Sequence, residues 1–345
     1  MSRLRGLDLA RYLAFVGMVI VNFKIVMGVQ NADGFAARFS QMLEGRAAAT
    51  FVVLAGVGLG LAAARSDFGS TMSVTLRRAA FLLVIGLLNS LIFEADILHY
   101  YAFYFLFGVL LLPLNTRLLI AVIIALNLMF VLMILTLDFS AEWNWVTFAY
   151  TGFWTPAGFV KNLFFNGWHP VIPWLSFLLV GIVVSRLALG EGRVQRRLVF
   201  AGAVMWALAE GVSLILMPFA VAIDVELADL VGTAPVPPMP QYIAAGTGFA
   251  LVVTGLCLLV ADSMDRVDVL GLVTPAGRQT LTLYIAHIMI GMGVLEALGR
   301  LGGQSAQQAL VAALLFSFAA TLYAWIWARV FKRGPIEAAM RRLAG

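Results

Sequence analysis

The sequence is poor in charge. Only 12% of its 345 residues are charged, whereas 62% are hydrophobic and the mean hydropathy is +0.96. A soluble domain carries roughly 25% charged residues, so this chain lacks the charge that would cover a surface facing water. The composition excludes a soluble globular protein and predicts an integral membrane protein.

Cysteine and histidine are also scarce. Cys257 is the single cysteine, which excludes an intramolecular disulfide and a cysteine-based zinc cluster. The three histidines lie 70 and 118 residues apart and form no local ligand motif, so no metal site is predicted. The formal charge of +5 is better explained by membrane topology than by a nucleic-acid partner, and none is expected.

A bilayer core needs about 20 mostly apolar residues per helix. Apolar runs of about that length or somewhat shorter occupy residues 8–30, 46–64, 79–93, 97–114, 118–137, 170–189, 198–220, 241–261, 273–298 and 306–328. The first run lacks a cleavage motif, so no cleavable signal peptide is expected.

The distribution of basic residues predicts how these runs cross the membrane. With the N-terminus inside, 18 of the 23 lysines and arginines, beginning with Arg3, fall on the cytoplasmic side and five on the outer side. This split follows the positive-inside rule. We therefore predict an all-α polytopic integral membrane protein with about ten transmembrane helices, both termini cytoplasmic and a single membrane domain over residues 1–345.

The outer segment 138–169 is rich in tryptophan, with Trp143, Trp145, Trp154 and Trp168 among the eight of the chain. Tryptophan prefers the membrane interface, which favours an interfacial helix or a re-entrant segment. The alternative is an aromatic platform for a sugar ring.

Polar side chains inside the first apolar run are candidates for function because they are costly in a membrane. Asp8 and Arg11 lie three residues apart on one helical face, where they could form an ion pair at the cytoplasmic end. The alternative is that Arg11 receives an anionic ligand. Asn22 suits either a hydrogen bond between helices or a functional role.

The histidines are predicted in the outer half of the membrane or at its outer edge. His99 follows Asp96, His169 precedes the sixth run, and His287 lies within the ninth. Each could be a satisfied packing residue, but three at related depth favour proton transfer near neutral pH. Glu210, in the seventh run, could instead carry protons in a transporter.

Five stretches, in order along the chain, carry a family resemblance. They read LDLARYLAFVGMVIVNF, GRAAATFVVLAGVGLGL, DILHYYAFYFLFGVLLL, HPVIPWLSFLLVG and GRQTLTLYIAHIMI. They resemble segments of the transmembrane acyltransferase superfamily, and most closely the heparan-α-glucosaminide N-acetyltransferase-like proteins and their bacterial relatives. The resemblance extends from about residue 6 to residue 295. One departure is that the loop after the first run holds no histidine, where those proteins carry a catalytic one.

The resemblance implies an acyl donor, acetyl-CoA or another acyl-CoA, on the cytoplasmic side, and an acceptor, often a sugar, on the other side. Acyl transfer needs a base for the acceptor and donors for the developing oxyanion. His99, oriented by Asp96, is the preferred base and His287 the second choice. Asn22 would stabilise the oxyanion or position the thioester carbonyl.

The remaining site residues follow from the same scheme. Arg11 and Arg278 are expected to bind the CoA phosphates, because arginine contacts phosphate bidentately. His169, Trp168 and Trp174 are expected to bind the acceptor. The composition suits a bacterial inner membrane, the bilayer is a partner, and a homodimer is left open.

Two other functions compete with the acyltransferase. Glu210 and the many glycines would also suit a small-molecule transporter or flippase without covalent chemistry. In a membrane scaffold, the polar residues would serve packing alone.

Overall fold

The structure is a computed structural model that describes residues 4–29 and 33–345. Arg3, the first of the predicted inner cations, and residue 30, the end of the first predicted run, lie outside these ranges. The chain forms two compact units, which are described separately. The first comprises Met1–Leu54, Ala188–Gly202 and Phe249–Arg342, and the second comprises Ala55–Leu187, Ala203–Gly248 and Leu343–Gly345.

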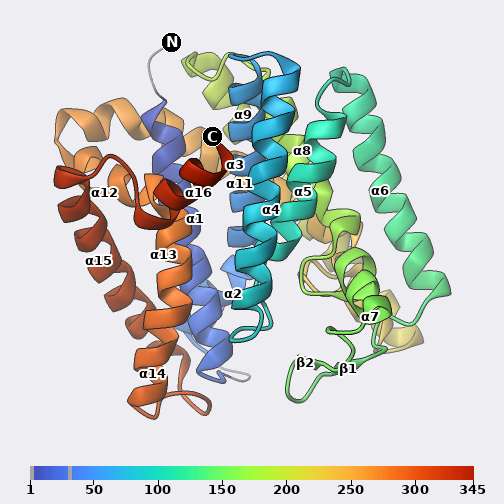
Figure 1. Cartoon of the computed structure of the whole chain (residues 1–345). Coiled ribbons are helices and arrows are strands. Elements are labelled where there is room, and N and C mark those ends of the chain that lie inside the picture. Colours follow the sequence, from blue (N-terminus) through green and yellow to red (C-terminus); the bar gives the residue numbers. More distant parts are fainter. Residues whose placement is uncertain (1–3, 30–32) are drawn as a thin grey trace. The chain divides into compact units, whose positions relative to one another are not determined.

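The first unit is built around α1, a helix that contacts α2, α12 and α15 (Figure 1). Its elements are α1 (Arg5–Val26), α2 (Phe35–Leu43), the start of α3 (Arg46–Ala63), α12 (Val269–Arg278), α13 (Thr280–Ala286), the π-helix η2 (His287–Met292), α14 (Gly293–Ala297), α15 (Ala306–Val330) and α16 (Pro335–Ala344), with parts of α9 (Gly192–Ile223) and α11 (Pro240–Arg266).

The second unit contains two closely packed helix pairs, α4 with α5 and α6 with α8. Its elements are α4 (Phe68–Asn89), α5 (Leu98–Leu111), α6 (Thr116–Thr136), the strands β1 (Trp143–Asn144) and β2 (Ala149–Tyr150), α7 (Pro156–Lys161), the π-helix η1 (Asn162–Asn166), α8 (Val171–Ser185) and α10 (Leu227–Val231), with the remainder of α3, α9 and α11. The two strands pair antiparallel, with Trp143 opposite Tyr150.

The prediction of an all-α polytopic membrane protein is confirmed. In the described ranges, eight helices are long and apolar enough to cross a membrane. A ninth candidate span is the pair Pro156–Asn166 and Val171–Ser185, bent by 52°, and α5 is a shorter apolar helix. Together they account for the ten predicted runs. Several helices, α6 and α9 among them, expose leucine, isoleucine or phenylalanine, as expected of surfaces that face lipid.

Local signals explain where several helices begin. Asp67, Asn115 and Ser305 each cap a helix by accepting a hydrogen bond from a backbone N–H of its first turn, which satisfies a donor that the helix itself leaves open. The cap at Asp67 starts α4 at Phe68, well before the predicted residue 79. The predicted run 273–298 is broken at Gln279, which separates α12 from α13.

Candidate active site

The end of α4 and the beginning of α5 position the central histidine of the second unit. Gly86 lies in the last turn of α4, where an added Cβ would be 2.2 Å from the His99 backbone nitrogen. Only glycine therefore allows the first turn of α5 to come so close to α4. His99 is 1% exposed, on the second residue of α5.

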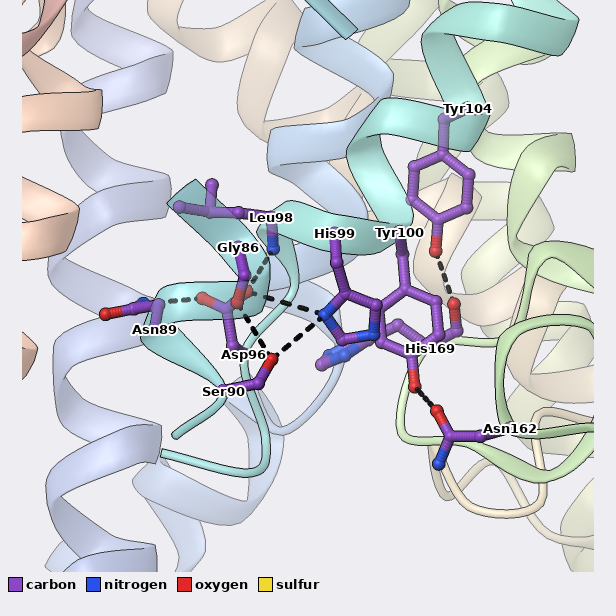
Figure 2. Close-up of polar contacts among 10 residues, drawn as sticks. All are labelled: Gly86, Asn89, Ser90, Asp96, Leu98, His99, Tyr100, Tyr104, Asn162 and His169. Atoms are coloured by element: carbon purple, nitrogen blue, oxygen red, sulfur yellow. Dashed lines mark hydrogen bonds and ion pairs between the residues drawn. The ribbon is translucent and has the colours of Figure 1, made fainter. Parts of the chain in front are cut away.

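Two acceptors face one nitrogen of the His99 ring (Figure 2). Nδ1 lies 3.3 Å from Ser90 Oγ and 3.6 Å from Asp96 Oδ2. The first distance is a hydrogen bond, whereas the second is too long for one and is an electrostatic contact. The predicted orientation by Asp96 is thus supplemented by Ser90, which sequence reasoning missed.

Asp96 is itself held in place. It is fully buried, and its Oδ1 accepts a hydrogen bond from Asn89 Nδ2 at 2.6 Å while its Oδ2 accepts one from the Leu98 backbone N–H at 2.8 Å. Buried carboxylates are tolerated when they are paired and hydrogen-bonded in this way. Asp96 therefore presents a fixed acceptor to His99.

The other ring nitrogen of His99, Nε2, is buried and has no hydrogen-bond partner among the described residues. A buried polar atom without a partner is rare and calls for an explanation such as a bound ligand. The arrangement orients the imidazole through Nδ1 and leaves Nε2 for chemistry.

Aromatic rings connect His99 to two of the predicted acceptor residues. The Tyr100 ring contacts both His99, at 3.9 Å between centroids, and His169, at 5.8 Å. His169 contacts Trp174 at 4.6 Å. Tyr100 donates a hydrogen bond from its hydroxyl to Asn162 Oδ1 at 2.5 Å, and this fixes the ring that joins the two histidines.

The predicted acceptor residues also carry unsatisfied polar atoms. His169 Nδ1, Trp168 Nε1 and Trp174 Nε1 are buried without hydrogen-bond partners in the part of the chain that the structure describes. These atoms and His99 Nε2 lie on residues of one unit, and three of the four residues are linked by the ring contacts through Tyr100. Such a group can hydrogen-bond a polar ligand.

The tryptophan-rich segment packs onto this region as a hairpin. Asn166 anchors it, because its side-chain amide donates to two backbone carbonyls and its Oδ1 accepts from the Tyr150 hydroxyl at 3.0 Å. Burial, together with the nearby carboxylate of Glu142, raises the pKa of Tyr150 above its ordinary value, so this phenol stays protonated as a donor. Trp143 contacts Trp168 edge to face, at 5.3 Å between centroids.

A second buried polar pair lies in the first unit. Asn22 Nδ2 donates a hydrogen bond to His287 Nε2 at 2.9 Å, although 265 residues separate them. Because an amide nitrogen can only donate, Nε2 accepts and Nδ1 carries the proton, which it donates to the Tyr284 carbonyl. Both nitrogens of His287 are therefore engaged.

The two predicted phosphate ligands also lie in the first unit. Arg11 donates to Asp8 at 2.8 Å, so the expected ion pair forms. Gly277 packs against the backbone of α1, where an added Cβ would be 1.8 Å from the Asp8 carbonyl oxygen. Arg278, the next residue, is exposed. One close contact thus links the helix of Arg11 to that of Arg278.

Sequence reasoning missed residues that have no chemistry of their own. The site also depends on contacts made by Ser90, Asn89 and Tyr100 at the ends of helices. No local sequence pattern predicts these contacts. Within the described ranges, no group of three or more histidine, cysteine, aspartate or glutamate residues could hold a metal ion.

Two families match the sequence. Residues 3–216, more than half of the chain, match the family described as heparan-alpha-glucosaminide N-acetyltransferase, catalytic. Residues 192–345 match the family described as protein of unknown function (DUF418), which is related to transmembrane acyltransferases. No curated protein matches the chain. The chain belongs to the heparan-alpha-glucosaminide N-acetyltransferase catalytic family and is an acetyltransferase-type membrane protein.

Proposed function

We propose that this protein transfers an acetyl group from acetyl-CoA to an amino sugar, with His99 as the base. The observation that carries the proposal is the state of the His99 ring, with Nδ1 held by Ser90 and Asp96 and Nε2 buried without a partner. The matched family's name supports an acetyl donor and a glucosaminide acceptor.

The choice between the two predicted bases rests on their hydrogen bonds. His287 uses Nε2 to accept from Asn22 and Nδ1 to donate to a backbone carbonyl, so it has no free lone pair. His99 has one. His99 is therefore the base, and His287 orients Asn22.

The reaction needs Nε2 of His99 to take up one proton and then to release it to the leaving thiolate. The neutral amine of the acceptor attacks the thioester carbonyl carbon, and Nε2 takes a proton from the attacking nitrogen. The tetrahedral intermediate collapses, the C–S bond breaks, and the CoA thiolate takes up the proton. Asn22, in the first unit, has two amide hydrogens and commits one to His287, so the second can position the thioester carbonyl of a donor bound to that unit.

The donor binds through the first unit. Arg11 and Arg278 contact the CoA phosphates, for which arginine is well suited. Arg11 precedes Asn22 by eleven residues on α1, which is about 16 Å along a helix axis. An extended pantetheine arm can run along α1 over that distance.

The acceptor binds through the second unit. The indole N–H groups of Trp168 and Trp174 would donate to sugar hydroxyls, and the partly exposed rings of Trp168 and His169 would offer apolar surfaces to a sugar ring. In this proposal, Trp168 belongs to an aromatic platform for a sugar ring, the alternative that the tryptophan-rich segment 138–169 left open.

The same proposal includes how the protein is oriented in the membrane and in which membrane it lies. Both termini and the CoA site face the cytoplasm, the acceptor site faces the outer side, and the membrane is the bacterial inner membrane. At one end of the first unit Arg5 pairs with Asp265, which supports a charged inner surface there. A single membrane domain over residues 1–345 and a homodimer stay predictions.

Binding of acetyl-CoA and CoA to the purified full-length protein tests the donor side. By calorimetry, Arg11→Ala and Arg278→Ala should each weaken binding by about 10-fold, because each removes a charge-assisted contact. Arg193→Ala, which removes an arginine of the same unit at the start of α9, is the matched control. Binding that is absent in the wild type, or equal in all four proteins, would refute the proposed donor site.

Transfer by protein in sealed vesicles tests the acceptor and its side. Labelled acetyl-CoA is supplied on the cytoplasmic face and glucosamine or a terminal α-glucosaminide on the opposite face. The proposal predicts a labelled N-acetyl product on the acceptor side. Product formed only when both substrates share one face would contradict the orientation.

A further inference from the structure

We infer that Ser90 is a positioning residue that holds the proton of His99 on Nδ1 and so keeps the lone pair on Nε2. The inference rests on the proposed role of His99 as the base. It concerns a residue outside the reacting groups, at the C-terminal end of α4, one helix turn after Gly86 (Figure 2).

The direction of the Ser90 hydrogen bonds carries the argument. The Ser90 hydroxyl has one proton, and Oγ donates it to the Gly86 carbonyl at 2.8 Å. This bond to the carbonyl four residues earlier is a common arrangement for serine in a helix. Toward His99, therefore, Ser90 offers only lone pairs, and the hydrogen bond at 3.3 Å requires a proton on Nδ1.

Asp96 acts in the same direction. Its Oδ2 lies 3.6 Å from Nδ1 and can only accept when it is ionised. A lone pair on Nδ1 would face two acceptors, whereas an N–H there satisfies Ser90 and faces the carboxylate favourably. Because Asp96 is beyond hydrogen-bond distance, Ser90 makes the direct bond that selects the tautomer.

The backbone keeps Ser90 within reach of the ring. The close approach at Gly86 brings the His99 backbone against the last turn of α4, and Leu98 donates its backbone N–H to Asp96. Ser90 is buried, so water does not compete for the bond. The tautomer that leaves Nε2 unprotonated is thus fixed before any substrate binds.

Nitrogen-15 NMR of the resting full-length protein, labelled at histidine, tests the inference without turnover. In alkaline buffer, His99 of the wild type should show a protonated Nδ1 and an unprotonated Nε2. The signal is assigned by its loss in His99→Gln. His287 is an internal reference, because its Nδ1 donates to Tyr284.

Ser90→Ala should move the tautomer ratio of His99 by about 3- to 10-fold toward the form with the proton on Nε2, the range expected for loss of one neutral hydrogen bond. Ser90→Thr, whose hydroxyl can make the same bond to the carbonyl four residues earlier, should restore the wild-type ratio. Ser40→Ala is the matched control, since Ser40 is buried and donates to the Ala36 carbonyl.

The outcomes separate this inference from the proposed function. If the tautomer ratio of His99 shifts in Ser90→Ala and returns to the wild-type value in Ser90→Thr, the positioning role of Ser90 is supported. This holds even if the protein transfers no acetyl group, a result that would refute the proposed function alone. A wild-type His99 with its proton on Nε2, or a Ser90→Ala ratio equal to that of Ser40→Ala, overturns the inference. If Ser90→Ala does not fold, Ser90→Gly, which also removes the hydroxyl, takes its place, and a wild-type His99 with its proton on Nε2 still overturns the inference.

Discussion

Replacing Gly86 by alanine perturbs the site through the backbone. The new Cβ would lie 2.2 Å from the His99 backbone nitrogen and 2.8 Å from its Cα. Backbone atoms cannot swing aside as a flexible side chain can, and packed atoms stay more than about 3 Å apart, so α4 and α5 would separate by roughly 1 Å. His99 moves with α5 while Ser90 stays on α4.

The magnitude follows from this displacement. Misplacement of a catalytic group by about 1 Å can cost about 10²-fold in rate, and overpacking a buried contact costs about 1 to 3 kcal/mol of stability. Acetyl transfer and thermal unfolding of the purified variant measure both quantities. Gly211→Ala is the control, because nothing lies within 4 Å of the Cβ it adds, and alanine is favoured over glycine in a helix. If Gly86→Ala kept wild-type transfer and melting temperature, the argument from close packing would be refuted.

Three further predictions concern other contacts. His287→Ala should lower the free energy of unfolding by about 1 to 3 kcal/mol, since it leaves the buried amide of Asn22 without its acceptor, and equal denaturation curves would contradict this. Gly277→Ala should weaken acetyl-CoA binding in calorimetry, because its Cβ would lie 1.8 Å from an α1 carbonyl oxygen and displace Arg278; unchanged affinity would separate that contact from the CoA site. Asp67→Ala should lower the melting temperature at neutral pH, because the cap is lost. Hydrogen bonds from the backbone and the side chain of Ser70 lower the pKa of Asp67, so its contribution is present above the ordinary value of 3.8 and is lost as pH falls through the lowered pKa. The wild-type and variant melting temperatures should therefore converge in acid, and a constant difference would contradict the assignment.

Apolar runs of membrane length were sufficient to predict the membrane helices, because such runs follow directly from the cost of placing polar groups in lipid. They could not predict that α4 starts at its Asp67 cap, or that the ninth run breaks at Gln279, since caps and breaks depend on single residues. The spacing of three predicted the Asp8–Arg11 pair.

The candidate site was predictable in its residue types and not in its contacts. Histidines in apolar runs are conspicuous, so His99 and His287 stood out from the sequence alone. Their different states arise from Ser90 and Asn22, which reach them across helix boundaries or over 265 residues. Such long-range contacts leave no periodic trace in the sequence, which is why the sequence ranked His99 above His287 but could not show how the hydrogen bonds of their ring nitrogens differ.

The central claim is that His99 is the base of an acetyltransferase. The most direct measurement is the rate of labelled acetyl transfer from acetyl-CoA to a terminal α-glucosaminide by the wild type, His99→Gln and His287→Gln in lipid vesicles. The account predicts transfer by the wild type, a loss of about 10²-fold or more in His99→Gln, and a much smaller loss in His287→Gln. Transfer by His99→Gln at the wild-type rate, or a larger loss in His287→Gln than in His99→Gln, would contradict it.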